Sequence, residues 1–231
     1  MNIIVNGGSN GIGREVVLQL ATDKNNQILV TGRNEARLKE LQMECLNENV
    51  TYIKLDISQL NREIETVRDQ IYNRFSRVDI LINVAGFLVV ADFMNLSDHD
   101  SRNIMETNFF GPAAFIKLLV PLMSAGSHIV NISSMGGYQG SSKYRGLSVY
   151  SASKAALSCL SECLAVEFSE SGISVNCLAL GSVQTEMFES AFPGYEAPLT
   201  ANEIAGFISY FAVNGNKFFN GKVLPVAVKN P

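Results

Sequence analysis

Short apolar runs recur along the chain, and longer polar or amphipathic segments separate them. The runs are continuously apolar rather than alternating, which is typical of strands covered on both faces. The intervening segments are long enough to be helices, so the pattern indicates repeated βαβ units. It predicts strands at residues 2–6, 27–31, 51–56, 80–83, 128–133, 174–180 and 222–228. It predicts helices at residues 12–22, 35–46, 59–74, 98–123, 149–169 and 201–213, and leaves 184–198 irregular.

These elements predict an α/β fold class: a Rossmann-type, doubly wound, seven-stranded parallel sheet with helices on both faces. The sequence contains no internal repeat, low-complexity segment or linker. We therefore expect residues 1–231 to form a single domain.

Two of the predicted helices carry more apolar surface than a sheet can cover. Helix 149–169 has a row of small residues, here called the small-residue stripe, which consists of Ala152, Ala156, Cys159 and Cys163. Residues 109–123 are apolar nearly all round, with Lys117 as the only charge. A thick core within one subunit would explain both helices, and so would a subunit interface. We favour the interface and expect a homodimer or homotetramer.

Composition narrows the classes of function. Hydrophobic residues make up 47% of the chain and charged residues 17%, which excludes intrinsic disorder. The net charge of −4, the absence of Trp and the lack of basic runs predict no nucleic-acid partner. No apolar stretch approaches the ~18 residues that span a membrane, and the first strand leaves no room for a signal peptide, so we expect a cytoplasmic protein with no membrane partner. The 4 cysteines are expected to be reduced thiols, and no metal site is predicted.

A glycine-rich turn follows the first predicted strand and opens the first helix. Its spacing is Gly-x3-Gly-x-Gly, and such glycines let the backbone approach a pyrophosphate at the positive end of the helix. No Gly-Lys-Ser/Thr follows, so a P-loop is excluded. At the first turn of a doubly wound sheet, the pattern indicates a dinucleotide site more strongly than turn geometry alone. The expected contacts in this turn are Gly7, Ser9, Asn10, Gly11, Ile12 and Gly13.

The end of the second predicted strand bears on the choice between NAD and NADP. Arg33 stands where an acid would bind the ribose 2′-hydroxyl, and a guanidinium can bind a 2′-phosphate that an acid would repel. We therefore expect NADP(H) in preference to NAD(H). The alternative is that Arg33 only begins a solvated helix and pairs with Glu35. Asp56, which closes the third predicted strand, either accepts a hydrogen bond from the adenine amino group or merely caps the next helix.

Tyr150 and Lys154 lie four residues apart, and so one turn apart on one face of the predicted helix. A nearby cation favours the ionised phenol, whose free pKa is about 10, and helps it to exchange a proton near neutral pH. Ser134 follows the fifth predicted strand at the carboxyl edge of the sheet. A hydroxyl at that edge can hydrogen-bond a carbonyl oxygen as the oxygen gains charge.

With these motifs in order along essentially the whole chain, the sequence resembles the short-chain dehydrogenase/reductase family. The resemblance implies that Ser134 polarises the substrate carbonyl and that Tyr150 is the general acid/base. It implies that Lys154 lowers the pKa of Tyr150 and holds the nicotinamide ribose, and that Asn108 binds the water of a proton relay. The further cofactor contacts that it implies are Ile57, Asn83, Ala85, Gly86, Gly181, Val183 and Thr185, with Thr185 at the nicotinamide carboxamide.

The sequence departs from the family pattern at supporting positions. Asn6 stands where the family usually has Thr, Val84 where it has Asn, and Leu180 where it has Pro. The stretch before the tyrosine is longer than usual and carries Lys143, Tyr144 and Arg145. This insert either selects an anionic substrate or forms a solvated loop; we favour the loop.

The expected activity is hydride transfer between NADP(H) and a small-molecule carbonyl or secondary alcohol. Two alternatives stay open: reduction of a 3-oxoacyl thioester, and a catalytically idle NADP(H)-binding regulatory protein. An epimerase or dehydratase of the extended relatives is disfavoured by the chain length and the glycine spacing. The substrate is expected to contact the segment after Thr185, in which Met187, Phe188, Phe192 and Tyr195 form either an apolar lid or part of the core.

Overall fold

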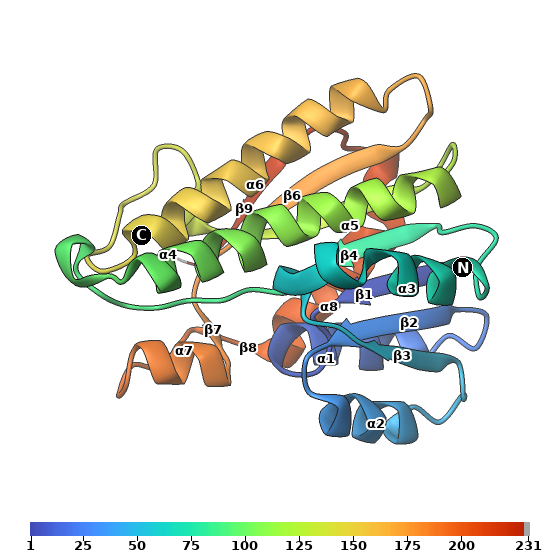
Figure 1. Ribbon diagram of the computed structural model, residues 1–231, viewed down its shortest axis with the longest axis horizontal. Helices are drawn as coiled ribbons and strands as arrows, with labels where there is room; N and C mark the ends of the chain where they lie inside the picture. The colour runs from blue at the N-terminus through green and yellow to red at the C-terminus, as the bar shows by residue number, and fades with distance from the viewer. Residues whose placement is uncertain (229–231) are drawn as a thin grey trace.

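The computed structural model describes residues 1–228, and its centre is a seven-stranded sheet (Figure 1). The strands are β1 (Asn2–Asn6), β2 (Gln27–Gly32), β3 (Val50–Lys54), β4 (Ile80–Asn83), β5 (His128–Ser134), β6 (Ser174–Leu180) and β9 (Val223–Val226). Their order across the sheet is β3-β2-β1-β4-β5-β6-β9, and every pairing is parallel. The predicted Rossmann-type, doubly wound sheet is confirmed.

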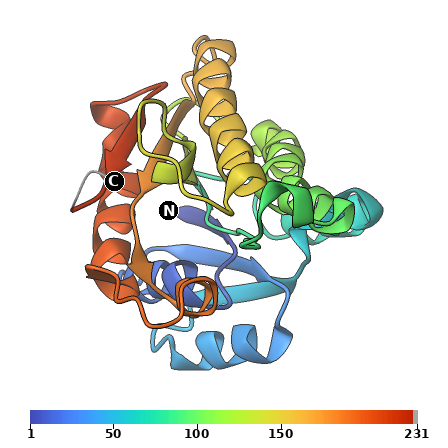
Figure 2. The same ribbon diagram turned by 90° about the vertical axis from the view of Figure 1, so that its left-hand side faces the viewer.

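Helices cover both faces of the sheet (Figures 1 and 2). One face carries α1 (Gly11–Ala21), α2 (Glu35–Glu44) and α8 (Ala201–Asn214), and the other carries α3 (Leu60–Tyr72), α4 (Asp98–Met105), α5 (Gly111–Leu119) and α6 (Ser148–Glu167). Because successive strand residues point to opposite faces, β1 contributes to both cores. Ile3 and Val5 pack into the core that includes Val17 of α1, whereas Ile4 packs into the core that includes Phe115 of α5.

The prediction of one α-helix over residues 98–123 is wrong. The segment is divided into α4, a π-helical stretch η3 (Glu106–Phe110), α5 and a 3-10 turn η4 (Val120–Leu122). Pro112 has no N–H to donate to the carbonyl four residues before it, which disrupts regular α-helical bonding there. A side chain at Gly111 would also collide with the backbone of Ile57, so only glycine permits this close approach.

The prediction that residues 184–198 are irregular is wrong for residues 184–191 and confirmed for 192–198. The segment contains the short helix α7 (Glu186–Ala191), and β7 (Val183–Gln184) before it pairs in parallel with β8 (Leu199–Thr200) after it. We call residues 186–198 the lid. The other predicted elements are confirmed, with ends displaced by no more than two residues.

Candidate active site

A cavity of about 990 Å³ opens where the parallel strands end, between the glycine turn and the lid. Most of the residues that the sequence singles out line it: Gly7, Ser9, Asn10, Gly11, Ile12, Arg33, Asp56, Ile57, Ala85, Gly86, Ser134, Tyr150, Lys154, Gly181, Val183 and Thr185. Gly13, Asn83 and Asn108 are buried and do not line it.

The glycine turn is packed too tightly for side chains at two of its positions. Gly7 has a φ of +95°, and a Cβ there would collide with the backbone of Ala85. A Cβ at Gly13 would collide with the carbonyl oxygen of Gly7, so Gly13 supports the turn from below. Asn10 precedes α1 without capping any helix amide through its side chain. This close backbone approach and the uncapped helix start fit a pyrophosphate bound at the amino end of α1.

Arg33 lines the far end of the cavity and takes part in no ion pair within residues 1–228. The alternative, an ion pair between Arg33 and Glu35, does not occur within these residues. Glu35 instead lies 3.8 Å from the amine of Lys54. Asp56 also lines the cavity and caps the 3-10 turn η1 (Ile57–Gln59). Its Oδ1 accepts hydrogen bonds from the amide and the hydroxyl of Ser58 at 3.0 and 2.7 Å. The cap therefore uses one carboxylate oxygen, and a base amino group could still be bound by the other.

A row of buried polar side chains crosses the sheet beneath the cavity. We call Thr31, Asn6, Asn83 and Asn131, which are register partners on β2, β1, β4 and β5, the polar row. Thr31 donates to Asn6 at 3.1 Å, Asn6 to Asn83 at 3.1 Å, Asn83 to Asn131 at 2.8 Å, and Asn131 to Ser161 of α6 at 2.9 Å. Asn83 is thus a positioning residue that links the glycine-turn strand to the helix of Tyr150.

Sequence reasoning missed half of the polar row and also its partner on α6. Thr31, Asn131 and Ser161 were not singled out, although the signal was present as one polar residue near the end of each otherwise apolar strand. Asn6, the departure from the usual Thr, is explained here, because its amide can donate to Asn83 while its carbonyl oxygen accepts from Thr31.

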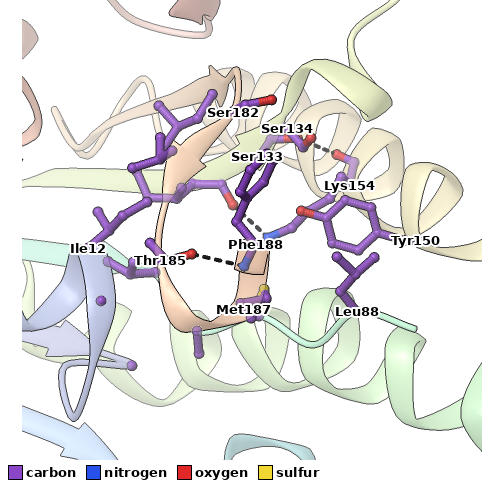
Figure 3. A pocket seen from close by; sticks show the side chains of 18 of the residues that line it. Ile12, Leu88, Ser133, Ser134, Tyr150, Lys154, Ser182, Thr185, Met187 and Phe188 are labelled. Carbon is purple, nitrogen blue, oxygen red and sulfur yellow. Dashed lines mark hydrogen bonds between the residues drawn. The ribbon is translucent and has the colours of Figure 1, made fainter. Parts of the chain in front are cut away.

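Tyr150 and Lys154 lie on the first turns of α6, and Ser134 is the last residue of β5 (Figure 3). Burial raises the pKa of Tyr150, and a hydrogen bond with Ser134 acts in the opposite direction. Burial lowers the pKa of Lys154 to about 8. The lysine amine donates to the carbonyl of Ile132 at 2.9 Å. Burial therefore has the larger effect on the pKa of Tyr150 in this arrangement, and the lowering by Lys154 that the family resemblance implies stays a prediction.

Ser133 fixes the end of β5 to α6. Its hydroxyl donates to the carbonyl of Lys154 at 2.8 Å and accepts from the hydroxyl of Ser158 at 3.0 Å. Adjacent strand residues point to opposite faces, so Ser133 anchors the helix while Ser134 faces the cavity. Sequence reasoning missed Ser133, for which the pair of serines at the strand end was the available signal.

Asn108 lies in the π-helical stretch, fully buried. Its Oδ1 accepts from the amide of Phe87 at 2.7 Å, and its Nδ2 donates to the carbonyl of Phe87 at 2.9 Å and to Ser153 at 3.0 Å. A Cβ on Gly86 would lie 3.6 Å from both Asn108 Oδ1 and the amine of Lys154. The side chain of Asn108 therefore holds the loop after β4 against α6, directly behind the cavity wall.

Thr185 directly precedes the lid, and its hydroxyl accepts from the amide of Phe188 at 3.2 Å and so caps α7. Glu186 follows, and one of its carboxylate oxygens accepts from Asn10 of the glycine turn at 2.7 Å and from Arg37 of α2 at 3.0 Å. Met187, Phe188, Phe192 and Tyr195 all line the cavity, which favours the lid interpretation over core packing.

No group of three or more His, Cys, Asp or Glu within residues 1–228 could hold a metal ion. The four cysteines in this range are free thiols. Among the described helices, none combines the length and the apolar character needed to cross a membrane.

Known proteins resemble this chain in sequence. The family model described as short chain dehydrogenase matches residues 1–196. L-fucose dehydrogenase of Mus musculus is 31% identical over 189 residues, which cover 81% of this chain and 67% of that protein. Retinol dehydrogenase 8 of Homo sapiens is 34% identical over 80% of this chain and 59% of that protein. The chain thus spans about two thirds or less of the length of these two relatives.

Solved structures resemble it in fold. A short-chain dehydrogenase/reductase from Serratia marcescens BCRC 10948 superposes with a TM-score of 0.87 at 25% identity, over 98% of this chain and 96% of that chain. A short-chain dehydrogenase from Shigella flexneri 2a, complexed with NADP, superposes with a TM-score of 0.87 at 26% identity, over 97% of this chain and 95% of that chain. With the glycine turn and the Ser, Tyr and Lys side chains gathered in one cavity, these similarities establish that the chain belongs to the short-chain dehydrogenase family and is an oxidoreductase.

Proposed function

We propose that this chain transfers hydride between NADP(H) and a carbonyl or secondary alcohol. The observation that carries the proposal is that Ser134, Tyr150 and Lys154 line the same cavity as the glycine turn and Arg33. A dinucleotide that extends from Arg33 along the turn would bring its other end to the hydroxyls of Ser134 and Tyr150.

Each side chain then has a defined task. The nicotinamide supplies the hydride when it is bound. Ser134 donates a hydrogen bond to the substrate oxygen, and Tyr150 gives that oxygen a proton during reduction and takes it back during oxidation. Lys154 holds the ribose hydroxyls, and Thr185 holds the carboxamide beside Gly181 and Val183. Asn108 binds the water of the proton relay through its backbone, since its side chain is engaged by Phe87 and Ser153.

The preference for NADP(H) rests on Arg33. Its guanidinium lines the cavity and is not engaged by Glu35, so it is available to a 2′-phosphate. Asp56 would accept from the adenine amino group. The Shigella flexneri relative, which is complexed with NADP, supports the same choice.

The decisive experiment follows NADPH absorbance with a panel of ketones, aldehydes, sugars including L-fucose, retinal and a 3-oxoacyl thioester. The sugar and retinal represent the compounds for which two relatives are named. Tyr150→Phe should abolish turnover while NADPH binding, measured by fluorescence titration, is kept. Preferred turnover of the thioester would favour the acyl alternative, and an enzyme that binds NADPH but turns over nothing would favour the idle, regulatory one.

We infer further that the chain assembles as a homodimer or homotetramer through α6. Three of the four members of the small-residue stripe, Ala152, Cys159 and Cys163, are exposed, and Val166 on the same helix is 75% exposed. No helix of the described chain covers this stripe, which a second copy could bury. Light scattering tests this, and a monomer at micromolar concentration would contradict it. We also propose that the chain forms a single domain, which one cooperative unfolding transition would support. We further propose a cytoplasmic location, which cell fractionation tests.

A further inference from the structure

The part of the cavity around Tyr150 is walled mainly by apolar side chains. Figure 3 shows Leu88 beside the Tyr150 ring, with Met187 and Phe188 of the lid in the same part of the cavity. Phe192 of the lid also lines this cavity. Large apolar side chains from two separate segments thus surround the position at which the substrate would meet the phenol.

The two cationic side chains of the insert near the mouth are already engaged. Arg145 lines the cavity, but its Nε and Nη2 each donate to Asp92 at 2.6 Å, one to each carboxylate oxygen. The hydrogen bond from Arg145 lowers the pKa of Asp92, so the pair carries no net charge at neutral pH. Lys143 donates to the carbonyl of Tyr138 at 2.7 Å and to Ser141 at 2.8 Å.

The backbone holds this arrangement in place. The amide of Ala91, next to Asp92, donates to the carbonyl of Gly146, next to Arg145, at 3.1 Å. Gly146 has a φ of +83°, and a Cβ there would lie only 3.0 Å from the side chain of Val90. The loop after β4 and the loop before α6 are therefore joined at the mouth, and the Arg145–Asp92 pair is part of that junction.

The other charged groups of the cavity are also assigned. Glu186 is bonded to Asn10 and Arg37, and Arg33 and Asp56 belong to the adenosine end of the proposed cofactor site. Among the lid residues that line the cavity, Ser190 and Tyr195 each add one hydroxyl. A carboxylate or phosphate bound beside Tyr150 would lose its hydration without gaining a free cationic partner. A polyhydroxylated substrate would leave several hydroxyls unpaired.

We infer that the substrate is an uncharged, apolar ketone or aldehyde, or the corresponding alcohol. This inference rests on the proposed oxidoreductase function. Apolar surface of the substrate would be removed from water against Leu88 and the lid, while only its carbonyl oxygen would need polar partners. The insert accordingly does not select anions, because its two cations are bonded to other groups.

The test compares three probes with the full chain and NADPH: an aryl alkyl ketone, the same ketone with a para-carboxylate, and a monosaccharide. We expect kcat/KM for the parent ketone to exceed that for the carboxylate by about 10-fold or more. Thermal shifts of the NADPH-bound protein with each probe report binding without turnover. The parent ketone should raise the melting temperature, and the other two should not.

Two variants sharpen the test. Asp92→Asn frees Arg145, so the ratio of kcat/KM for the carboxylate to that for the parent should rise several-fold, and added salt should reduce the gain. Asp98→Asn removes an equal charge from α4 away from the cavity and should leave the ratio unchanged. Met187→Gln should raise KM for the parent ketone, whereas the same change at the exposed Met43 of α2 should not.

The outcomes distinguish failure of the substrate inference from failure of the oxidoreductase proposal. If the carboxylate or the sugar is turned over with the highest kcat/KM, the substrate inference is overturned and the oxidoreductase proposal stands. If the parent ketone binds to the NADPH-bound protein but is not reduced, the oxidoreductase proposal fails and the apolar site stands. If the ketone neither binds nor reacts, the apolar site is overturned.

Discussion

Glu186, the first residue of α7, accepts a hydrogen bond from Asn10 in the glycine turn at 2.7 Å. The same oxygen accepts from Arg37 at 3.0 Å, and this bond lowers the pKa of Glu186. One carboxylate therefore joins three parts of the proposed cofactor site: the lid, the turn before α1 and the helix that follows Arg33.

Glu186→Gln tests what this carboxylate does. The amide can still accept from Asn10, but it no longer holds the Arg37 guanidinium by charge, so that cation becomes available to the 2′-phosphate of NADPH. We expect the ratio of NADH to NADPH dissociation constants, measured by fluorescence titration, to rise. Glu189→Gln, which changes the same helix where Glu189 accepts from Gln184, is the matched control. A fall in affinity for both nucleotides by the same factor would indicate that Glu186 only fastens the lid.

Arg33→Asp tests the cofactor preference. Replacing the guanidinium by a carboxylate removes charge-assisted hydrogen bonds to the 2′-phosphate and adds repulsion, so we expect kcat/KM for NADPH to fall by about 10-fold or more. The value for NADH should hold or rise, because the new acid can bind the ribose hydroxyls. Arg62→Asp on the exposed side of α3 controls for the change of net charge. An unaltered NADPH-to-NADH ratio would remove Arg33 from the proposed site.

Asn83→Leu tests the polar row. The variant removes the acceptor of Asn6 and the donor to Asn131 in the sheet interior, so two buried amides lose a partner. We expect the free energy of unfolding to fall by about 2–4 kcal/mol in denaturant titrations. Asn61→Leu on the exposed side of α3 should change it little. If NADPH affinity fell with no loss of stability, Asn83 would be a direct cofactor contact instead of a positioning residue.

His128 predicts how stability depends on pH. The ring is buried between β6 and α8, with Nδ1 bonded to the carbonyl of Ala212 and Nε2 to Asn176, and burial lowers its pKa from 6.5 to about 4. Between those values the unfolded chain binds a proton that the folded chain does not. Stability therefore falls as the pH drops from 6.5 toward 4, with a contribution of about 3 kcal/mol at pH 4.

The variant His128→Asn isolates this contribution. It should lessen the difference in unfolding free energy between pH 7 and pH 4, whatever its effect at neutral pH. His99→Asn on α4 changes the other histidine, which is exposed, and should leave the pH dependence intact. Equal pH dependence in wild type and His128→Asn would contradict the assigned pKa.

The sheet was predictable because buried parallel strands are continuous apolar runs, and the glycine turn because tight backbone approach demands glycine at fixed spacing. The lid could not be predicted from the sequence. The strands that flank it, β7 and β8, have two residues each and form only by pairing with one another. The engagement of Asn108 by Phe87 and Ser153 was equally hidden, because it depends on a π-helical stretch that the apolar pattern of residues 98–123 does not distinguish from α-helix. Local sequence patterns thus predicted which side chains lie near the cavity, while tertiary contacts determine which of these side chains face it.

The anchoring of α6 by Ser133 bears on how this scaffold could diversify. At the end of β5, Ser133 bonds to the helix that carries Tyr150, while the hydroxyl of Ser134 faces the cavity. The spacing between the hydroxyl oxygens of Ser134 and Tyr150 is therefore set by rigid secondary structure. The lid shares none of those bonds. Mutations in the lid can therefore change substrate specificity during evolution, while the relative positions of Ser134 and Tyr150 are conserved.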